Sequence, residues 1–67
     1  MIVSFAGTVD SISEDGFVVF VGKPGGYKLP AEPEDIALVI RKAFRAGATL
    51  EIQYDDHDQS IFDAKLA

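Results

Sequence analysis

The sequence predicts a small, mainly β domain with one helix, ordered as three strands, the helix and two further strands. Three observations predict this class. Only segment 32–47 has helical periodicity, short apolar runs with strand character flank it on both sides, and turns rich in Gly, Pro and Asp separate those runs. Periods of 3.6 and 2 residues distinguish helices from half-buried strands. The 67 residues are enough for a single domain spanning positions 1–67.

The size of the chain bears on its oligomeric state. A domain this short buries only about 60% of its unfolded surface, and small domains often gain stability from a disulfide, a metal or a partner subunit. The sequence has no Cys and one His, which excludes disulfides and Cys- or His-rich zinc sites. We therefore expect no cofactor and predict a homo-oligomer.

Charge and hydropathy disfavour some classes of binding partner. The formal net charge is −5 at pH 7, which disfavours nonspecific binding to nucleic acids or anionic membranes. No apolar run approaches the roughly 20 residues needed to span a bilayer, so we expect no membrane insertion. The sequence shows neither Cys nor a basic segment followed by an apolar one. This favours a cytoplasmic location, or secretion if a signal segment has been removed.

The first strand is predicted at Ile2–Ile12. Its inward face carries alternating residues, namely Val3, Phe5, Gly7 and Val9. Ile12 breaks this alternation, and a bulge or bend after Val9 would return it to the core face. Gly7 in mid-strand indicates a bend or a close approach of the backbone.

The second strand, 17–21, is apolar on both faces. Such a strand either lies between two layers or has its outer face covered by a partner, and both alternatives stay open. In the second case Val18 and Phe20 are oligomer interface candidates, together with Ile61 from the last strand. A short third strand is predicted at 27–30, with Tyr27 and Leu29 on one face.

The helix at 32–47 has one apolar stripe, formed by Ile36, Val39, Ile40, Ala43 and Phe44. Pro33 suits the first helical position, where a missing N–H costs no hydrogen bond. Gly47 suits the residue just after the helix, which often adopts a left-handed conformation.

The other side of the helix presents Leu38, Arg41, Lys42 and Arg45. Cations near a helix C-terminus have a structural reason, since they oppose the negative end of the dipole, and a lone surface Leu is common. However, acidic residues predominate in the rest of the chain. These residues are therefore further oligomer interface candidates, able to meet acidic surface on a neighbouring copy.

Two strands close the sequence. Segment 48–55 alternates, with Leu50, Ile52 and Tyr54 inward, as in a half-buried antiparallel strand. Segment 61–66 is the last strand, with Phe62, Ala64 and Leu66 predicted inward and Ile61 outward.

The polar loop between these strands is the only candidate for metal chemistry. Its weak candidate ligands are Asp55, Asp56, His57 and Asp58. They lack the spacing of a calcium-binding loop, so a solvated turn is favoured over a metal- or pH-responsive module. No recognisable motif places a nucleophile or an acid beside His57. We predict no catalytic residues and a non-enzymatic protein.

The order of elements resembles the OB-fold, a five-stranded Greek-key barrel. At this length it resembles the receptor-binding B subunits of Shiga-type toxins. The stretches that carry the resemblance are 6–9 (Ala-Gly-Thr-Val), 16–22 (Gly-Phe-Val-Val-Phe-Val-Gly), the helix, 47–52 (Gly-Ala-Thr-Leu-Glu-Ile) and 61–62. The resemblance implies a ring of five subunits and a glycan ligand. This chain lacks that family's paired cysteines and signal peptide, and the family's sugar-binding residues map to no positions here.

A second resemblance supplies the alternative function. Segments 7–9 and 16–17 are similar to the opening of cold-shock domains, which are also OB barrels. This resemblance implies a single-stranded nucleic-acid-binding OB domain, with Phe17, Phe20 and Tyr27 as stacking residues. Core or interface packing is favoured for these aromatics, and the acidic charge disfavours nucleic acid. The alternative fold is an open α+β two-layer sheet covered by one helix.

Overall fold

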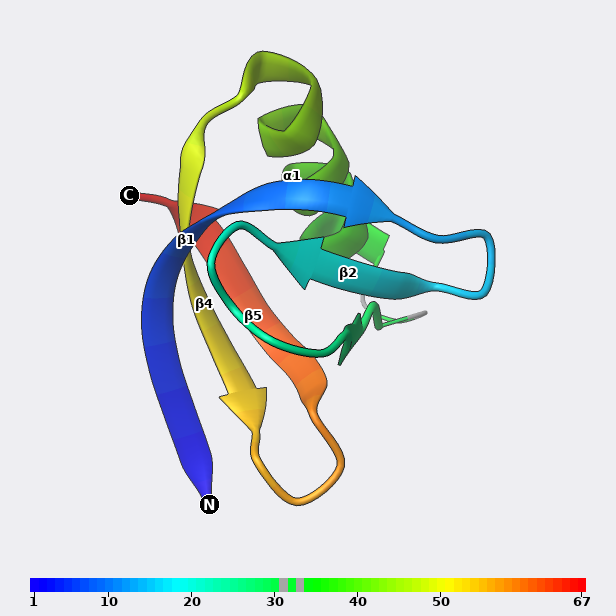
Figure 1. Ribbon diagram of the computed structural model, residues 1–67, viewed down its shortest axis with the longest axis vertical. Helices are drawn as coiled ribbons and strands as arrows, with labels where there is room; N and C mark the ends of the chain where they lie inside the picture. Colours follow the sequence, from blue (N-terminus) through cyan, green and yellow to red (C-terminus); the bar gives the residue numbers. More distant parts are fainter. Residues whose placement is uncertain (31, 33) are drawn as a thin grey trace.

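The computed structural model describes residues 1–30, 32 and 34–67. It contains β1 (Ile2–Ile12), β2 (Phe17–Phe20), β3 (Tyr27–Lys28), α1 (Glu34–Ala46), β4 (Thr49–Asp55) and β5 (Ser60–Leu66) (Figure 1). The order of elements and the mainly β class with one helix are thus confirmed. Within the described residues, no helix has the length and apolar character required to cross a membrane.

β1 is long enough to pair with two different strands. Its first half runs antiparallel to β4, from Ile2 opposite Asp55 to Thr8 opposite Thr49. Its second half pairs with β2, and the register shifts between Val9 and Ser11. The bulge predicted after Val9 is therefore confirmed, and it returns Ile12 to the core.

The five strands form a mixed sheet that closes into a ring in the order β1-β2-β3-β5-β4 and back to β1. Four of the five junctions are antiparallel, and the β3–β5 junction is a single parallel pair between Lys28 and Ser60. The Lys28 N–H also donates to the Gln59 carbonyl at 2.8 Å. The open-sheet alternative is therefore wrong, because the pairing of β3 with β5 leaves no free edge between these strands.

α1 covers one end of the ring, where it packs against β5, β1 and β4 (Figure 1). Ile36, Ile40 and Ala43 are buried as the stripe predicts. At the C-terminus Gly47 has φ of 66°, and the Ala48 N–H donates to the Ala43 carbonyl at 2.9 Å. This is a Schellman ending, which confirms the role predicted for Gly47. The first-position role of Pro33 lies outside the described residues.

The core joins the ring to the helix. Six side chains are almost completely buried, namely Val18, Phe20, Ile40, Leu50, Ile52 and Ile61. Four aromatic rings, Phe20 among them, pack mostly edge to face in this core: Phe5, Phe20, Tyr27 and Tyr54. Each such aromatic pair adds about 0.5–1.5 kcal/mol beyond its buried area.

Burial corrects one group of interface candidates. Val18, Phe20 and Ile61 are 0%, 1% and 2% exposed, so they belong to the core of a single chain and cannot contact another folded copy. The Val18–Phe20 face of β2 looks into the ring, whereas Phe17 and Val21 on the other face are exposed, so β2 does not lie between two layers of the single chain.

The last strand corrects a second prediction. A register irregularity lies beside Gln53 and Tyr54, whose partners on β5 are Asp63 and Ile61. Phe62 is passed over by this bulge and is exposed, whereas Ile61 turns inward. Ala64 is buried as predicted, but Leu66 is 63% exposed at the end of the strand. A bulge adds one residue to one strand and so reverses the alternation on one side of it.

Tyr27 gives the fold a measurable pH dependence. Burial raises the pKa of the Tyr27 hydroxyl, and the neighbouring Tyr54 adds to the shift. A phenol with a raised folded pKa contributes stability below its unfolded pKa of about 10, and this is lost as pH rises through the folded value. We expect the melting temperature, measured by circular dichroism, to fall less steeply above about pH 10 for Tyr27→Phe than for the unmodified chain. The same dependence of melting temperature on pH in the two proteins would contradict this role of Tyr27.

Candidate assembly surface around the helix

The outer side of α1 combines one apolar residue with three cations. Leu38, Arg41, Lys42 and Arg45 are all exposed, and Leu38 has 51% of its surface free. Because they are three or four residues apart, they lie on one face of the helix, opposite the buried stripe. All four are therefore accessible to a partner molecule. Val18, Phe20 and Ile61, which are buried in the core, are not.

These cations have no ion pair among the residues that the structure describes. The ion pairs found there join the Met1 amino group to Asp55 Oδ1 at 3.7 Å and to Asp56 Oδ1 at 3.1 Å. Arg41, Lys42 and Arg45 make up half of the six basic residues of a chain with 11 acidic ones. The helix thus concentrates positive charge on an otherwise acidic protein.

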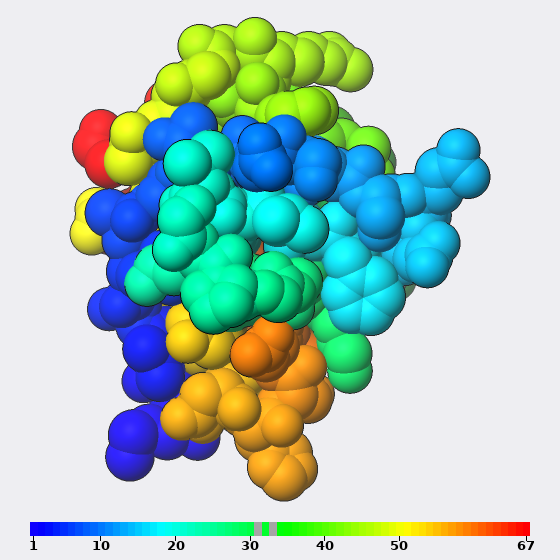
Figure 2. Space-filling model, viewed as in Figure 1, coloured from blue at the N-terminus to red at the C-terminus, as the bar shows by residue number. Residues whose placement is uncertain are grey.

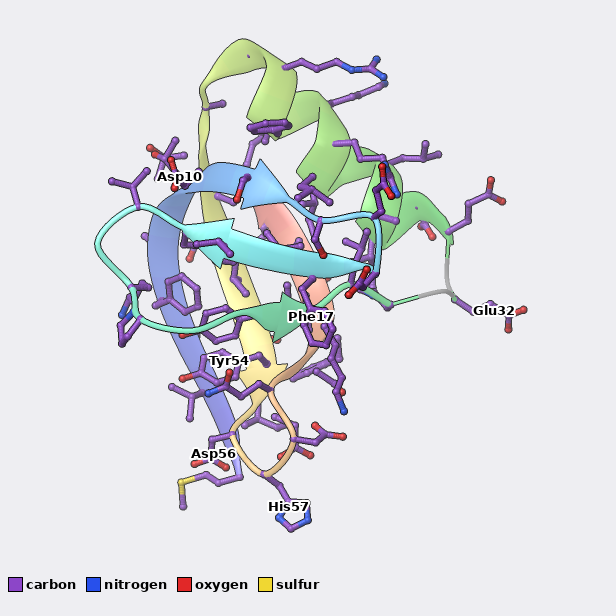
Figure 3. The ribbon with its side chains drawn as sticks, turned by 45° about the vertical axis from the view of Figure 1, so that its right-hand side comes forward. Asp10, Phe17, Glu32, Tyr54, Asp56 and His57 are labelled. Carbon is purple, nitrogen blue, oxygen red and sulfur yellow. The ribbon has the colours of Figure 1, made fainter. Side chains whose placement is uncertain are left out.

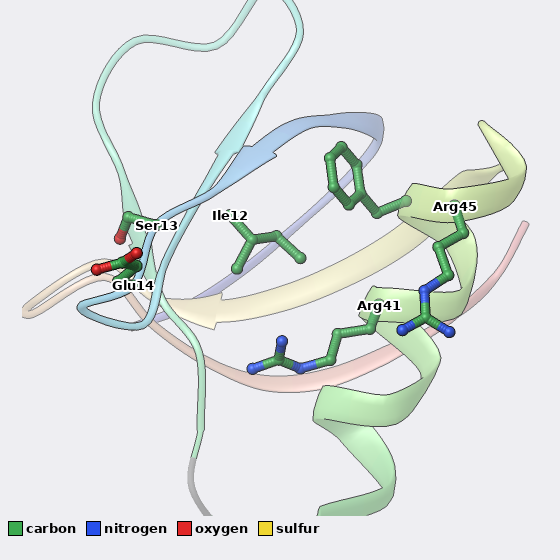
Figure 4. A pocket seen from close by; sticks show the side chains of 6 residues that line it. Ile12, Ser13, Glu14, Arg41 and Arg45 are labelled. Atoms are coloured by element: carbon green, nitrogen blue, oxygen red, sulfur yellow. The ribbon is translucent and has the colours of Figure 1, made fainter.

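Two grooves flank the helix and divide this surface. The first has a volume of about 490 Å³ and lies between α1 and the β1–β2 turn (Figure 4); its lining residues are Ile12, Ser13, Glu14, Arg41, Phe44 and Arg45. We call it the basic groove. Arg41 extends toward the Ser13–Glu14 turn, and Arg45 follows one helical turn later. A volume of this size lies within the range of ligand-binding clefts.

The second groove lies between α1 and β5. It has a volume of about 390 Å³, and its lining residues are Val39, Lys42, Ala64, Lys65 and Leu66. The four helix candidates therefore share the outer side of α1, which runs between the two grooves. Arg41 and Arg45 line the basic groove, Lys42 lines the second groove, and Leu38 lies on the exposed side of α1.

The β1–β2 turn that forms one wall of the basic groove is held by its own hydrogen bonds. Ser13 Oγ accepts from the Phe17 N–H at 3.0 Å, and the Ser13 N–H donates to the Phe17 carbonyl at 2.8 Å. Gly16 takes a φ of 89°, which Gly adopts without the steric cost of a Cβ. This fixes the position of Glu14 opposite the arginines.

The acidic loop, residues 55–60 between β4 and β5, lies at the other end of the molecule. Its carboxylates bind backbone groups: Asp55 Oδ1 accepts from the His57 N–H at 2.9 Å and Asp58 Oδ1 from the Ser60 N–H at 3.1 Å. The second bond holds the pKa of the Asp58 carboxyl below its ordinary value. These are side-chain turns that cap a hairpin.

The structure does not bring the candidate metal ligands together. Across residues 1–30, 32 and 34–67, no group of three or more Asp, Glu, His or Cys side chains is arranged to hold a metal ion. His57 projects from the tip of the loop, and Asp56 turns toward the chain start (Figure 3). Asp56, His57 and Asp58 are all exposed on this loop.

The predicted stacking residues are also separated. Phe20 and Tyr27 are 1% and 4% exposed and belong to the core. Phe17 alone is accessible, on the outer side of β2 (Figure 3). A single exposed ring does not form the row of aromatics on which successive bases stack.

Sequence patterns missed two features of the surface. Phe44 was assigned to the buried stripe, but it is 41% exposed and lines the basic groove. It lies at the edge of the stripe, where helical geometry alone leaves burial undecided. Exposed apolar side chains also occur at both ends of the molecule: Ile2 and Phe62 lie near the acidic loop, and Leu38 and Phe44 belong to α1.

The space-filling view shows how these ends differ. The start of β1 and the acidic loop protrude at the bottom of the view, and the C-terminal part of α1 forms the top (Figure 2).

No protein-family model, curated protein or solved structure matches this chain.

Proposed function

We propose that this protein is a non-enzymatic OB-fold module that assembles with copies of itself through the exposed side of α1. The single observation that carries the proposal is the surface of Leu38, Arg41, Lys42 and Arg45. It is exposed, it is basic on an acidic chain, and its cations form no ion pair among the described residues.

The topology supports the OB-fold part of the proposal. The ring order β1-β2-β3-β5-β4 has a long bulged first strand that pairs on both sides. The helix lies between the third and fourth strands and covers one end of the ring. Those are the features of a five-stranded Greek-key barrel. On this fold the resemblance to toxin B subunits favours a ring, and a glycan is the ligand that it implies.

Two observations support a binding rather than a catalytic role for the basic groove. Ser13, the hydroxyl that lines the basic groove, is engaged by the Phe17 N–H. His57, the one imidazole of the chain, lies at the tip of the hairpin on the opposite end of the molecule. A nucleophile and its base must lie within hydrogen-bond reach of one another, and these two groups do not.

The exposed apolar residues support self-assembly. Leu38, Phe44 and Leu66 are all exposed around the helix. Burial of apolar surface contributes about 25 cal/mol per Å², and a chain of 67 residues has few internal sources of stability. Covering the helix with a second copy would bury this surface and neutralise its charge together.

The proposal is tested by the mass in solution of three chains, measured by light scattering after size separation. We expect the unmodified chain to exceed the 7.2 kDa of one copy and Arg45→Glu to shift it toward one copy. Lys23→Glu makes the same change of net charge in a loop away from α1 and should leave the mass unchanged. Equal masses for Arg45→Glu and the unmodified chain would count against the proposed surface.

A further inference from the structure

The acidic loop and the basic groove lie on different halves of the molecule. The loop is at one end of the longest axis, and α1, whose residues line the groove, is toward the other (Figure 1). The molecule measures 29 × 25 × 22 Å along its principal axes, and the strands β4 and β5 hold the loop in place. One copy therefore cannot place its own loop in its own groove, whereas a second copy can.

The charges of the two surfaces are complementary. Asp56 and Asp58 are exposed on the loop. Asp56 Oδ1 lies 3.1 Å from the amino group of Met1, so a partner's arginine would compete with that exposed ion pair. Arg41 and Arg45 are exposed on one wall of the groove. Guanidinium groups bind carboxylates in a planar, often bidentate geometry. The Ser60 N–H donates to Asp58 Oδ1 at 3.1 Å, and this bond lowers the pKa of the carboxyl because it favours the charged form.

The remaining groups extend the match. Glu14 on the opposite wall of the groove would repel a uniformly acidic partner. The loop, however, carries His57 between its two aspartates, and its ring projects from the tip. An imidazole N–H can donate to a carboxylate, so the alternation of acid, imidazole and acid suits a groove with two arginines and one glutamate.

Apolar residues flank both surfaces. Ile2 lies opposite Asp55 at the start of β1, and Phe62 lies at the start of β5 beside the loop; both are exposed. Phe44 is exposed and lines the groove, and Ile12 lines it from β1. An apolar margin around a charged centre adds a contribution that salt does not screen.

We propose that the 55–60 loop of one copy docks in the basic groove of the next copy. The contact is head-to-tail, with Asp56 and Asp58 against Arg41 and Arg45. This inference rests on the proposed function, and it names the acidic loop of a second copy as the surface that α1 contacts. Each copy uses both surfaces, and a head-to-tail contact makes a ring if its rotation closes and a filament if it does not.

The test uses two variants that neutralise one surface each. The groove variant carries Arg41→Gln and Arg45→Gln, and the loop variant carries Asp56→Asn and Asp58→Asn. All four residues are exposed, and Asn preserves the side-chain turns of the loop. We expect either variant alone to fall to the 7.2 kDa of one chain, with a thermal melt that confirms its fold.

Mixing the two variants at equal concentration gives the decisive result. The intact loop of the groove variant can enter the intact groove of the loop variant, but both outer ends of that pair are neutralised. We therefore expect a complex of two chains that grows no further. A matched control, Asp10→Asn with Asp63→Asn, removes the same charge from exposed strand positions and should assemble like the unmodified chain.

The outcomes separate the inference from the proposed function. A loop variant that keeps the unmodified mass, or a mixture in which the chains stay single, overturns the head-to-tail contact and leaves assembly through α1 standing. An unmodified chain that stays single at every concentration overturns both. Assembly of the loop variant alone would point to contacts between two helices instead.

Discussion

Phe20→Ala is expected to lower the free energy of unfolding by about 3–5 kcal/mol, the usual cost of removing a buried ring. Phe20 is 1% exposed, and its ring packs against Phe5 with centroids 5.0 Å apart and against Tyr27 at 5.5 Å. Truncation would leave a cavity at the centre of the ring of strands. Because native domains are only about 5–15 kcal/mol more stable than their unfolded chains, much of the stability should be lost.

The measurement is urea unfolding followed by circular dichroism, with Val21→Ala as the matched control. Val21 is the next residue of the chain, and it is 62% exposed. Its truncation should change the free energy by no more than about 0.5 kcal/mol, as for other surface positions. Similar losses for the two variants would show that Phe20 does not lie in the core of a single chain.

Ile61→Ala is the second large expected effect, with a loss of about 2–5 kcal/mol. Ile61 is 2% exposed and faces Tyr54 across the β4–β5 ladder, on the far side of the bulge. Phe62, the larger residue, is 44% exposed, and Phe62→Ala should cost much less. This order is the reverse of what size alone predicts.

Denaturant melts of both variants decide between the two registers of β5. If the strand alternated without a bulge, Phe62 would point inward and Ile61 outward. A greater loss from Phe62→Ala than from Ile61→Ala would therefore contradict the bulge. Ala64 points inward in either register, so it cannot distinguish them.

Local patterns predicted most of the elements. The alternation of β1, its bulge after Val9 and the left-handed Gly47 each follow from a few neighbouring residues, and the structure confirms all three. The clean alternation of β4 likewise predicted the buried Leu50 and Ile52. Such features depend on periodicity and on backbone sterics, which the sequence carries directly.

The errors arose where burial depends on distant parts of the chain. Segment 17–21 is apolar on both faces, so its inward side is set by the strands that pair with it. Ring closure depends on a single pair, Lys28 with Ser60, and neither residue carries a local signal for it. The β5 bulge lies at a hairpin in which several registers satisfy the same pattern.

The candidate site was predicted in part for the same reason. Helical spacing selected Leu38, Arg41, Lys42 and Arg45, and all four are exposed. It did not place Ile12, Glu14 and Phe44 beside the arginines, because the β1–β2 turn reaches α1 only through the folded ring. The separation of the acidic loop from the basic groove is likewise a property of the tertiary structure.

The most direct test of self-assembly is sedimentation of the unmodified chain over a wide range of concentration at low and at high salt. We predict a mass above the 7.2 kDa of one chain that rises with concentration and falls when salt screens the charges. A mass equal to one chain at every concentration and in both salts would contradict the proposal.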